Sequence, residues 1–170
     1  MSEPNSKSGA SMSARDRHIF GKGPKRILSI DGGGARGAIS LIFLARMESL
    51  LRARMGNAEL RLCDYFDLIG GTSTGAIIAT GLALGMTVEE LIEIYRSLAK
   101  TGFQKSNWMS LAGYVSPKFR AGPLTEAIER QVGAETLGSD RLRTGLAIVA
   151  KRLDTESIWV FHNNPKGRFY

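Results

Sequence analysis

Short apolar runs alternate with longer helical patterns along most of this chain. Residues 26–30 form an apolar, β-branched run that stops at Asp31 and a cluster of glycines, which is typical of a buried strand. Residues 65–70, YFDLIG, form a second such run. Two further runs, at 144–153 and 157–162, are separated by a short polar segment. The pattern predicts four strands.

Helical patterns occupy the segments between the first three strands. Residues 38–55 are apolar nearly all round at first and one-sided later, which predicts a helix that starts buried, emerges at the surface and is capped by Gly56. The small residues of 76–85 suit a closely packed helix, and Thr87 and Glu90 form a capping box that opens an amphipathic one. Strands that alternate with helices predict a three-layer α/β fold with a mostly parallel sheet.

One long segment, 103–122, has no period and contains Gly, Ser, Asn and Pro. It is predicted to be a long loop or a lid-like excursion, and Pro123 is predicted to start a short helix that ends at Val132. The apolar side chains of this loop could touch a lipid. The favoured alternative is a loop folded over its own side chains.

Composition places the chain among ordinary globular proteins. Its 170 residues are 43% hydrophobic and 23% charged, which predicts one soluble domain. No apolar run reaches the roughly 18 residues that a membrane-spanning helix needs. Residues 1–25 are basic and carry no secretory apolar run, so we expect a disordered tail in a cytoplasmic protein and a folded domain over 26–170. The single cysteine, Cys63, is expected to be a small core residue.

The formal net charge of +7 suits an anionic partner, although charge alone does not identify one. A membrane surface and a nucleic acid both fit, as does a basic tail that merely stays solvated. We expect no nucleic acid, and the sequence leaves the oligomeric state open.

Residues 71–75, GTSTG, match the G-x-S-x-G pattern of a nucleophile elbow. The match lies directly after a predicted strand and directly before a predicted helix, which is the context in which the pattern has meaning. The turn is so tight that the residues two before and two after the serine must lack side chains, and Gly71 and Gly75 stand there. Ser73 is therefore predicted to project outward as a nucleophile.

A second glycine motif, DGGGARG at 31–37, also follows a strand and opens a helix. Several backbone N–H groups can converge there on one anionic point, as an acyl-transfer oxyanion requires. The same residues spell the G-x-G-x-x-G fingerprint of dinucleotide sites. That fingerprint calls for an acidic residue at the end of a second strand about 20 residues later, whereas residues 57–59 lie at the end of a predicted helix. Nucleotide binding is therefore the weaker alternative.

Together, DGGGARG and GGTSTG resemble the patatin-like phospholipase family, and the similarity runs from about Lys25 to the end of the chain through DYFDLIGGTSTGAIIA. The resemblance implies a lipid acyl hydrolase that needs no metal or organic cofactor. Its substrate would be a glycerolipid in a membrane or micelle, reached by peripheral contact with the membrane. Ser73 would be the nucleophile. The resemblance assigns the oxyanion hole to Gly32, Gly33 and Gly34, with Arg36 holding the loop or meeting a phosphate.

The family's general base is an aspartate in a later D-G-G or D-G-A motif, which takes the proton of the serine directly. After Ser73 this chain has only Asp140 and Asp154, and neither precedes a glycine. A triad of Ser73, Asp154 and His162 is disfavoured because Asp154 lies only eight residues before His162 across a predicted turn, and the remaining chain is too short for the separate loops that normally supply these two roles. We therefore expect a domain truncated before its catalytic aspartate and inactive alone. The alternative is a non-catalytic module that retains the glycine loop for an anion or a nucleotide.

Overall fold

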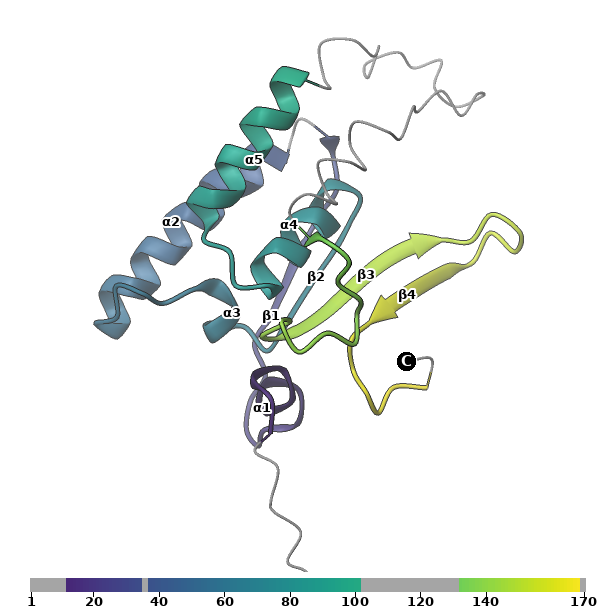
Figure 1. The fold of residues 1–170 in the computed structure, drawn as a ribbon, viewed down its shortest axis with the longest axis horizontal. Coiled ribbons are helices and arrows are strands. Elements are labelled where there is room, and N and C mark those ends of the chain that lie inside the picture. Colours follow the sequence, from purple (N-terminus) through teal and green to yellow (C-terminus); the bar gives the residue numbers. More distant parts are fainter. Residues whose placement is uncertain (1–11, 35–36, 102–131, 169–170) are drawn as a thin grey trace, which may run out of the picture.

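A computed structural model of the protein describes residues 12–34, 37–101 and 132–168. The four predicted strands are β1 (Ile27–Ile30), β2 (Leu68–Thr72), β3 (Gly145–Lys151) and β4 (Ile158–His162). They form one sheet in the order β1-β2-β3-β4 (Figure 1). The first three strands are parallel and β4 is antiparallel to β3. The prediction of a mostly parallel sheet is confirmed.

The helices of the first half end and begin where their capping residues predict. Helix α2 spans Gly37–Met55 and stops at Gly56, whose φ is 61°. The amide of Asn57 then donates to the carbonyl of Arg52 at 3.1 Å, which closes a Schellman cap. Helix α5, Val88–Thr101, opens with the predicted capping box. The amide of Thr87 donates to Glu90 Oε2 at 2.7 Å, and the amide of Glu90 donates to Thr87 Oγ1 at 3.1 Å.

Helices lie on both faces of the sheet, as the predicted α/β fold requires. Helix α4 (Thr74–Ala83) packs against β1, β2 and β3, and the short helix α3 (Leu62–Tyr65) precedes β2. Helix α5 contacts both α4 and α2, and Figure 1 shows α2 and α5 alongside each other. Helix α1 (Ala14–Phe20) covers only part of the opposite face, where it contacts β3 and shares a cavity with Ala147. The fully buried core includes Leu41, Leu62, Ile69, Leu82 and Leu146.

Helix α1 lies inside 1–25, for which the sequence predicted only a disordered tail. Ser13 caps it by accepting a hydrogen bond from the amide of Asp16 at 3.1 Å. His18 Nδ1 lies 2.9 Å from Asp67 Oδ1, just before β2, and the other oxygen of Asp67 accepts from the amide of Arg26 at 2.8 Å. Burial alone would raise the pKa of Asp67, but these hydrogen bonds and the charges of Lys25 and His18 lower it. Long-range contacts of this kind leave no periodic signal in the sequence.

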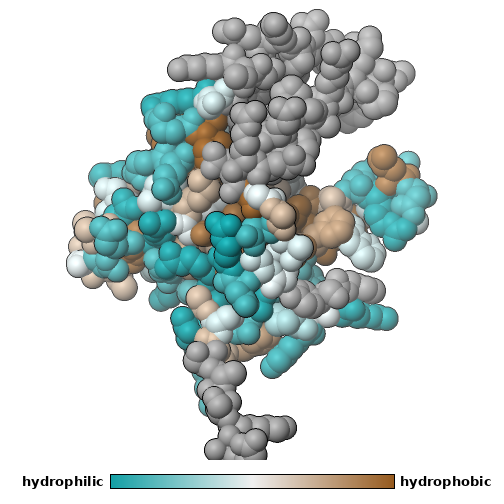
Figure 2. All heavy atoms as spheres, in the orientation of Figure 1, coloured by the Kyte–Doolittle hydropathy of each residue, from teal (hydrophilic) through white to brown (hydrophobic). Residues whose placement is uncertain are grey.

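Helix α2 is less buried at its start than its apolar sequence predicted. Ile42 and Phe43 are exposed, Phe43 to 71%, while Glu48 of the more polar half is fully buried. The reason is that α2 contacts α5 along one side only, and no other described element covers these two side chains. Figure 2 shows hydrophilic surface over much of the coloured part of the molecule, with apolar areas in the centre and at the tip of the β3–β4 hairpin. Leu153, in the turn of this hairpin, is 91% exposed.

Cys63 is a fully buried free thiol, and burial raises its pKa to about 12, as suits an unreactive core residue. Over the described ranges, no helix is both long and apolar enough to cross a membrane. The predicted loop at 103–122 and the helix from Pro123, apart from its end at Val132, lie outside the described residues.

Candidate active site

Ser73 occupies the sharp turn between β2 and α4. Its backbone has φ 50° and ψ −125°, a conformation that side-chain-bearing residues rarely adopt. Its carbonyl accepts the hydrogen bond of the Ala76 amide at 3.0 Å, so the serine is the N-cap of α4, and it is exposed. A strained, exposed serine between a strand and a helix has the geometry of a nucleophile elbow.

The two glycines that flank this turn are packed against backbone atoms. A methyl group added at Gly71 would lie 2.6 Å from the carbonyl carbon of Gly75. One added at Gly75 would overlap the carbonyl oxygen of Ile30, at the end of β1. These contacts explain why both positions exclude a side chain.

The glycine loop lies directly beside the serine. A methyl group at Gly32 would come within 2.8 Å of Ser73 Cβ. Two amides of the loop donate to the threonines on either side of the serine: Gly32 to Thr72 Oγ1 at 3.0 Å and Gly33 to Thr74 Oγ1 at 3.2 Å. The structure therefore brings together the two glycine motifs of the sequence. The threonine contacts were not predicted, although both residues are visible in GTSTG.

Tyr95 of α5 holds the other end of this loop. Its hydroxyl donates to the carbonyl of Gly34, and the amide of Gly37 donates to the same hydroxyl oxygen. Burial raises the pKa of Tyr95, so the hydroxyl stays protonated at neutral pH. Arg36 lies outside the described residues, and the role predicted for it stays a prediction. Sequence analysis missed Tyr95, which gives no local signal because it reads as one more residue of an amphipathic helix.

Asp154 and His162, the other two residues of the disfavoured triad, have partners away from Ser73. Asp154 lies in the turn between β3 and β4, where its side chain is 62% exposed and pairs with Arg152. His162 Nδ1 accepts a hydrogen bond from the amide of Asn164 at 3.3 Å. Among the described residues, no three His, Cys, Asp or Glu side chains gather as metal ligands would.

The second strand that a dinucleotide site would need is not found at 57–59. These residues form a turn after α2, in which the side chain of Asn57 accepts the amide of Glu59 at 3.0 Å. The next strand, β2, begins only at Leu68 and leads to the serine turn. The glycine loop thus precedes a long helix and a turn, which does not match the dinucleotide-binding unit.

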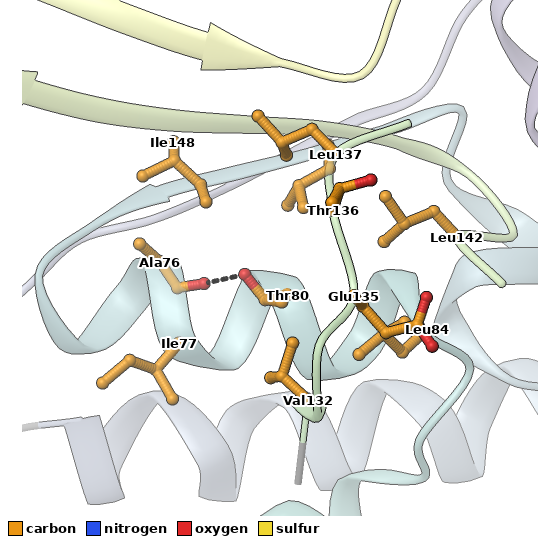
Figure 3. Close-up of a pocket in the computed structure, with 11 residues that line it drawn as sticks. Ala76, Ile77, Thr80, Leu84, Val132, Glu135, Thr136, Leu137, Leu142 and Ile148 are labelled. Carbon is orange, nitrogen blue, oxygen red and sulfur yellow. Dashed lines mark hydrogen bonds between the residues drawn. The ribbon is translucent and has the colours of Figure 1, made fainter. Parts of the chain in front are cut away.

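An apolar cavity of about 320 Å³ runs along α4, the helix that Ser73 caps. Figure 3 shows Ala76, Ile77 and Thr80 of α4 on one side of it and Ile148 of β3 on the other. The hydroxyl of Thr80 donates to the carbonyl of Ala76 at 2.8 Å, so it is already bonded within the helix. What faces the cavity is therefore mostly hydrocarbon, which suits an alkyl chain.

Known proteins are similar in sequence to most of this chain. The sequence model of the family described as Patatin-like phospholipase matches residues 28–168. A cGAMP-activated phospholipase of Escherichia coli (strain TW11681) is 39% identical over 121 residues, which cover 69% of this chain and 34% of that protein. A cGAMP-activated phospholipase of Vibrio cholerae is 35% identical over 127 residues, covering 70% of this chain and 36% of the relative.

Similarity extends to plants. Patatin-03 of Solanum tuberosum is 32% identical over 127 residues, covering 73% of this chain and 32% of that protein. The chain thus spans about a third of the length of these curated relatives. The matched region contains both glycine motifs and, apart from Ile27 at the start of β1, all four strands. The chain belongs to the patatin-like phospholipase family.

Proposed function

We propose that the protein containing this chain is a serine lipid acyl hydrolase in which Ser73 is the nucleophile and the amides of Gly32, Gly33 and Gly34 stabilise the oxyanion. The observation that carries the proposal is the contact between the two motifs: an exposed serine in a strained turn, with the backbone of Gly32 against its Cβ. Membership of a family of lipid hydrolases supports the same chemistry. Arg36 is proposed to hold this loop or to meet a phosphate group.

The proposed reaction begins when a general base removes the proton from Ser73 Oγ and the oxygen attacks an ester carbonyl. The negative charge that develops on the carbonyl oxygen is stabilised by loop amides, where loss of one such donor typically costs about 2.7 to 4 kcal/mol. Collapse of the intermediate expels the alcohol, which takes up the proton, and water then hydrolyses the acyl-enzyme. The base is proposed to be an aspartate outside these 170 residues, so the chain alone should be inactive.

The proposed substrate is a glycerolipid held in a membrane or a micelle. The apolar cavity along α4 supports this choice, because it begins one helical turn from Ser73 and is lined mainly by hydrocarbon. Peripheral contact with a membrane from the cytoplasm would bring the ester to the serine, and the net charge of +7 would favour an anionic surface.

The direct test measures hydrolysis of a short-chain nitrophenyl ester by the full-length protein and by its Ser73→Ala variant. We expect the substitution to reduce hydrolysis to the uncatalysed rate. Ser157→Ala, which removes a serine hydroxyl from the exposed β3–β4 turn, is the matched control and should keep full activity. Equal hydrolysis by the Ser73→Ala variant and the unmodified protein would overturn the assignment. Absence of hydrolysis in both, when both are folded, would favour the non-catalytic alternative.

A further inference from the structure

We propose that Thr72 and Tyr95 are positioning residues that hold the glycine loop from its two ends at a set distance from Ser73. The proposal rests on the proposed function for its catalytic meaning, but the hold itself is a property of the fold. It assigns a role to two side-chain hydroxyls that take no part in the proton transfers described above.

The first contact lies at the start of the loop. Thr72 is the last residue of β2, and its Oγ1 accepts the hydrogen bond of the Gly32 amide at 3.0 Å. The space between the chains is small, because a methyl group at Gly32 would lie 2.7 Å from the carbonyl oxygen of Thr72 and 2.8 Å from Ser73 Cβ. Strand β2 is paired on both sides within the sheet, so Thr72 is a rigid point of attachment.

The second contact lies at the end of the loop and is made by Tyr95, which is 61 residues from Gly34 in the sequence. The hydroxyl of Tyr95 donates to the carbonyl of Gly34 and accepts the amide of Gly37. One oxygen therefore bridges the two residues that flank positions 35 and 36 and fixes the separation of their backbones. A methyl group at Gly37 would lie 2.8 Å from this oxygen, so the ring also packs tightly against the start of α2.

Because the loop is held at its two ends, the backbone amides in its middle are the ones that can donate hydrogen bonds to a ligand. The amide of Gly32 donates to Thr72, which narrows the three oxyanion donors proposed above to Gly33 and Gly34, and the Gly33 amide makes only the longer 3.2 Å contact with Thr74. Oxyanion donors must be aimed before the charge develops, because a shift of 1 Å can reduce the rate about 100-fold. The hydroxyls of Thr72 and Tyr95 orient the loop amides from outside the loop, because the loop's own glycines restrict the backbone very little.

The experiment compares Thr72→Val and Tyr95→Phe in the full-length protein. Both substitutions keep the shape of the side chain and remove its hydroxyl. We expect each to lower kcat by about 10-fold to 100-fold while KM changes little, because ester binding is not altered. Thr72→Ser keeps the hydroxyl and should restore most of kcat. Amide hydrogen exchange in the 31–37 peptide should become faster in Thr72→Val and Tyr95→Phe, and slower again in Thr72→Ser.

Two matched controls separate positioning from stability. Thr144→Val removes a buried threonine hydroxyl that donates to the carbonyl of Phe66 at 2.6 Å, and Tyr65→Phe removes the hydroxyl of a partly buried tyrosine away from the loop. Thr144→Val should lower the melting temperature without lowering kcat of the folded fraction, and Tyr65→Phe should leave kcat unchanged. If these controls lower kcat as much as the two test variants do, the positioning role is overturned.

The two readouts also separate this inference from the proposed function. If the unmodified protein shows no hydrolysis that depends on Ser73, the proposed function fails, while hydrogen exchange still decides whether the hydroxyls hold the loop. If hydrolysis depends on Ser73 but neither kcat nor exchange responds to Thr72→Val and Tyr95→Phe, the inference fails and the proposed function stands.

Discussion

The turn around Ser73 and the glycine loop beside it are both rich in glycine, but the fold holds them by different means. In the turn, Gly71 and Gly75 pack directly against backbone atoms, and the strain falls on Ser73 itself. In the loop, the backbone is tied by hydroxyls that belong to other elements, β2, α4 and α5.

The difference shows that glycine serves two purposes in one site. In the turn it provides room for a close approach of chains, so any side chain at these positions meets a steric limit. In the loop, Gly32 also packs closely against Thr72 and Ser73, but Gly34, whose φ is 57°, shows the second purpose: it provides conformational freedom, which has to be removed by contacts from elsewhere. Substitutions should therefore affect the turn through packing and stability, and the loop through the hydrogen bonds that orient it.

The strongest way to test the packing of the turn is Gly75→Ala. The added methyl group would overlap the carbonyl oxygen of Ile30, which is fixed in β1, so we expect the free energy of unfolding to fall by about 3 kcal/mol or more. Urea denaturation measures the change. Gly133→Ala is the control, because φ at Gly133 is positive but no atom lies within 4 Å of the added methyl group. Gly75 itself has no positive φ, so a loss at Gly75 no larger than the strain measured at Gly133 would contradict the packing limit.

The next effect is a pH dependence of stability that arises where helix α2 meets α5, the helix that contains Tyr95. Glu48 of α2 is fully buried and accepts the amide of Val88, the first residue of α5, at 3.2 Å. Burial raises the pKa of Glu48 above its ordinary value of 4.5, although the Val88 amide and Arg52 oppose the rise and Glu89 adds to it. Between pH 4.5 and the raised pKa of Glu48, the native state therefore binds more protons than the unfolded chain. The free energy of unfolding should fall as the pH rises through this range.

Glu48→Gln cannot ionise and should remove this part of the pH dependence. Denaturation at several values between about pH 4 and about pH 8 should show that the stability of the unmodified protein relative to the variant decreases as the pH rises. Glu93→Gln is the control, since the side chain of Glu93 is 69% exposed and is not among the groups that shift the pKa of Glu48. Parallel pH profiles for the unmodified protein and Glu48→Gln would contradict the assignment.

Relief of the strain at Ser73 gives a smaller effect of opposite sign. Ser73→Gly should raise the free energy of unfolding by about 1 kcal/mol, because relief of about 1 to 3 kcal/mol of backbone strain exceeds the 0.5 to 1 kcal/mol of chain entropy that glycine adds. Thermal denaturation measures the gain, and hydrolysis should be lost at the same time. Ser73→Ala keeps a side chain in the strained conformation and should lose activity without becoming more stable.

The smallest effect is expected from Thr74→Val. The contact from the Gly33 amide to Thr74 is long, at 3.2 Å, and this amide has to turn to the oxyanion during the reaction. We expect kcat to change by less than about threefold, near 0.6 kcal/mol, the low end of a net hydrogen bond. A loss as large as that of Thr72→Val would show that both threonines hold the loop and that the contrast between them is mistaken.

Much of the fold could be predicted from the sequence because the signals were local. The capping box at Thr87 and Glu90, the cap at Gly56 and the strands β1, β3 and β4 lie where short patterns place them, while β2 begins three residues later than predicted because Tyr65 ends helix α3. Helix α1 was missed because its docking depends on the distant pair of His18 and Asp67. The exposure of Phe43 was also missed, because burial depends on which elements cover a helix and not on the helix's own period.

The sequence by itself determined the order of the four strands and of helices α2, α4 and α5, the placement of Ser73 in a tight turn and the family, because each depends on residues close together along the chain. Only the tertiary structure decided that Gly32 lies against Ser73 and that Thr72 and Tyr95 tie the loop. The physical reason is that a hydrogen bond between distant segments depends on how the sheet and its helices pack. Glycine, which carries no side chain, cannot specify its own partner.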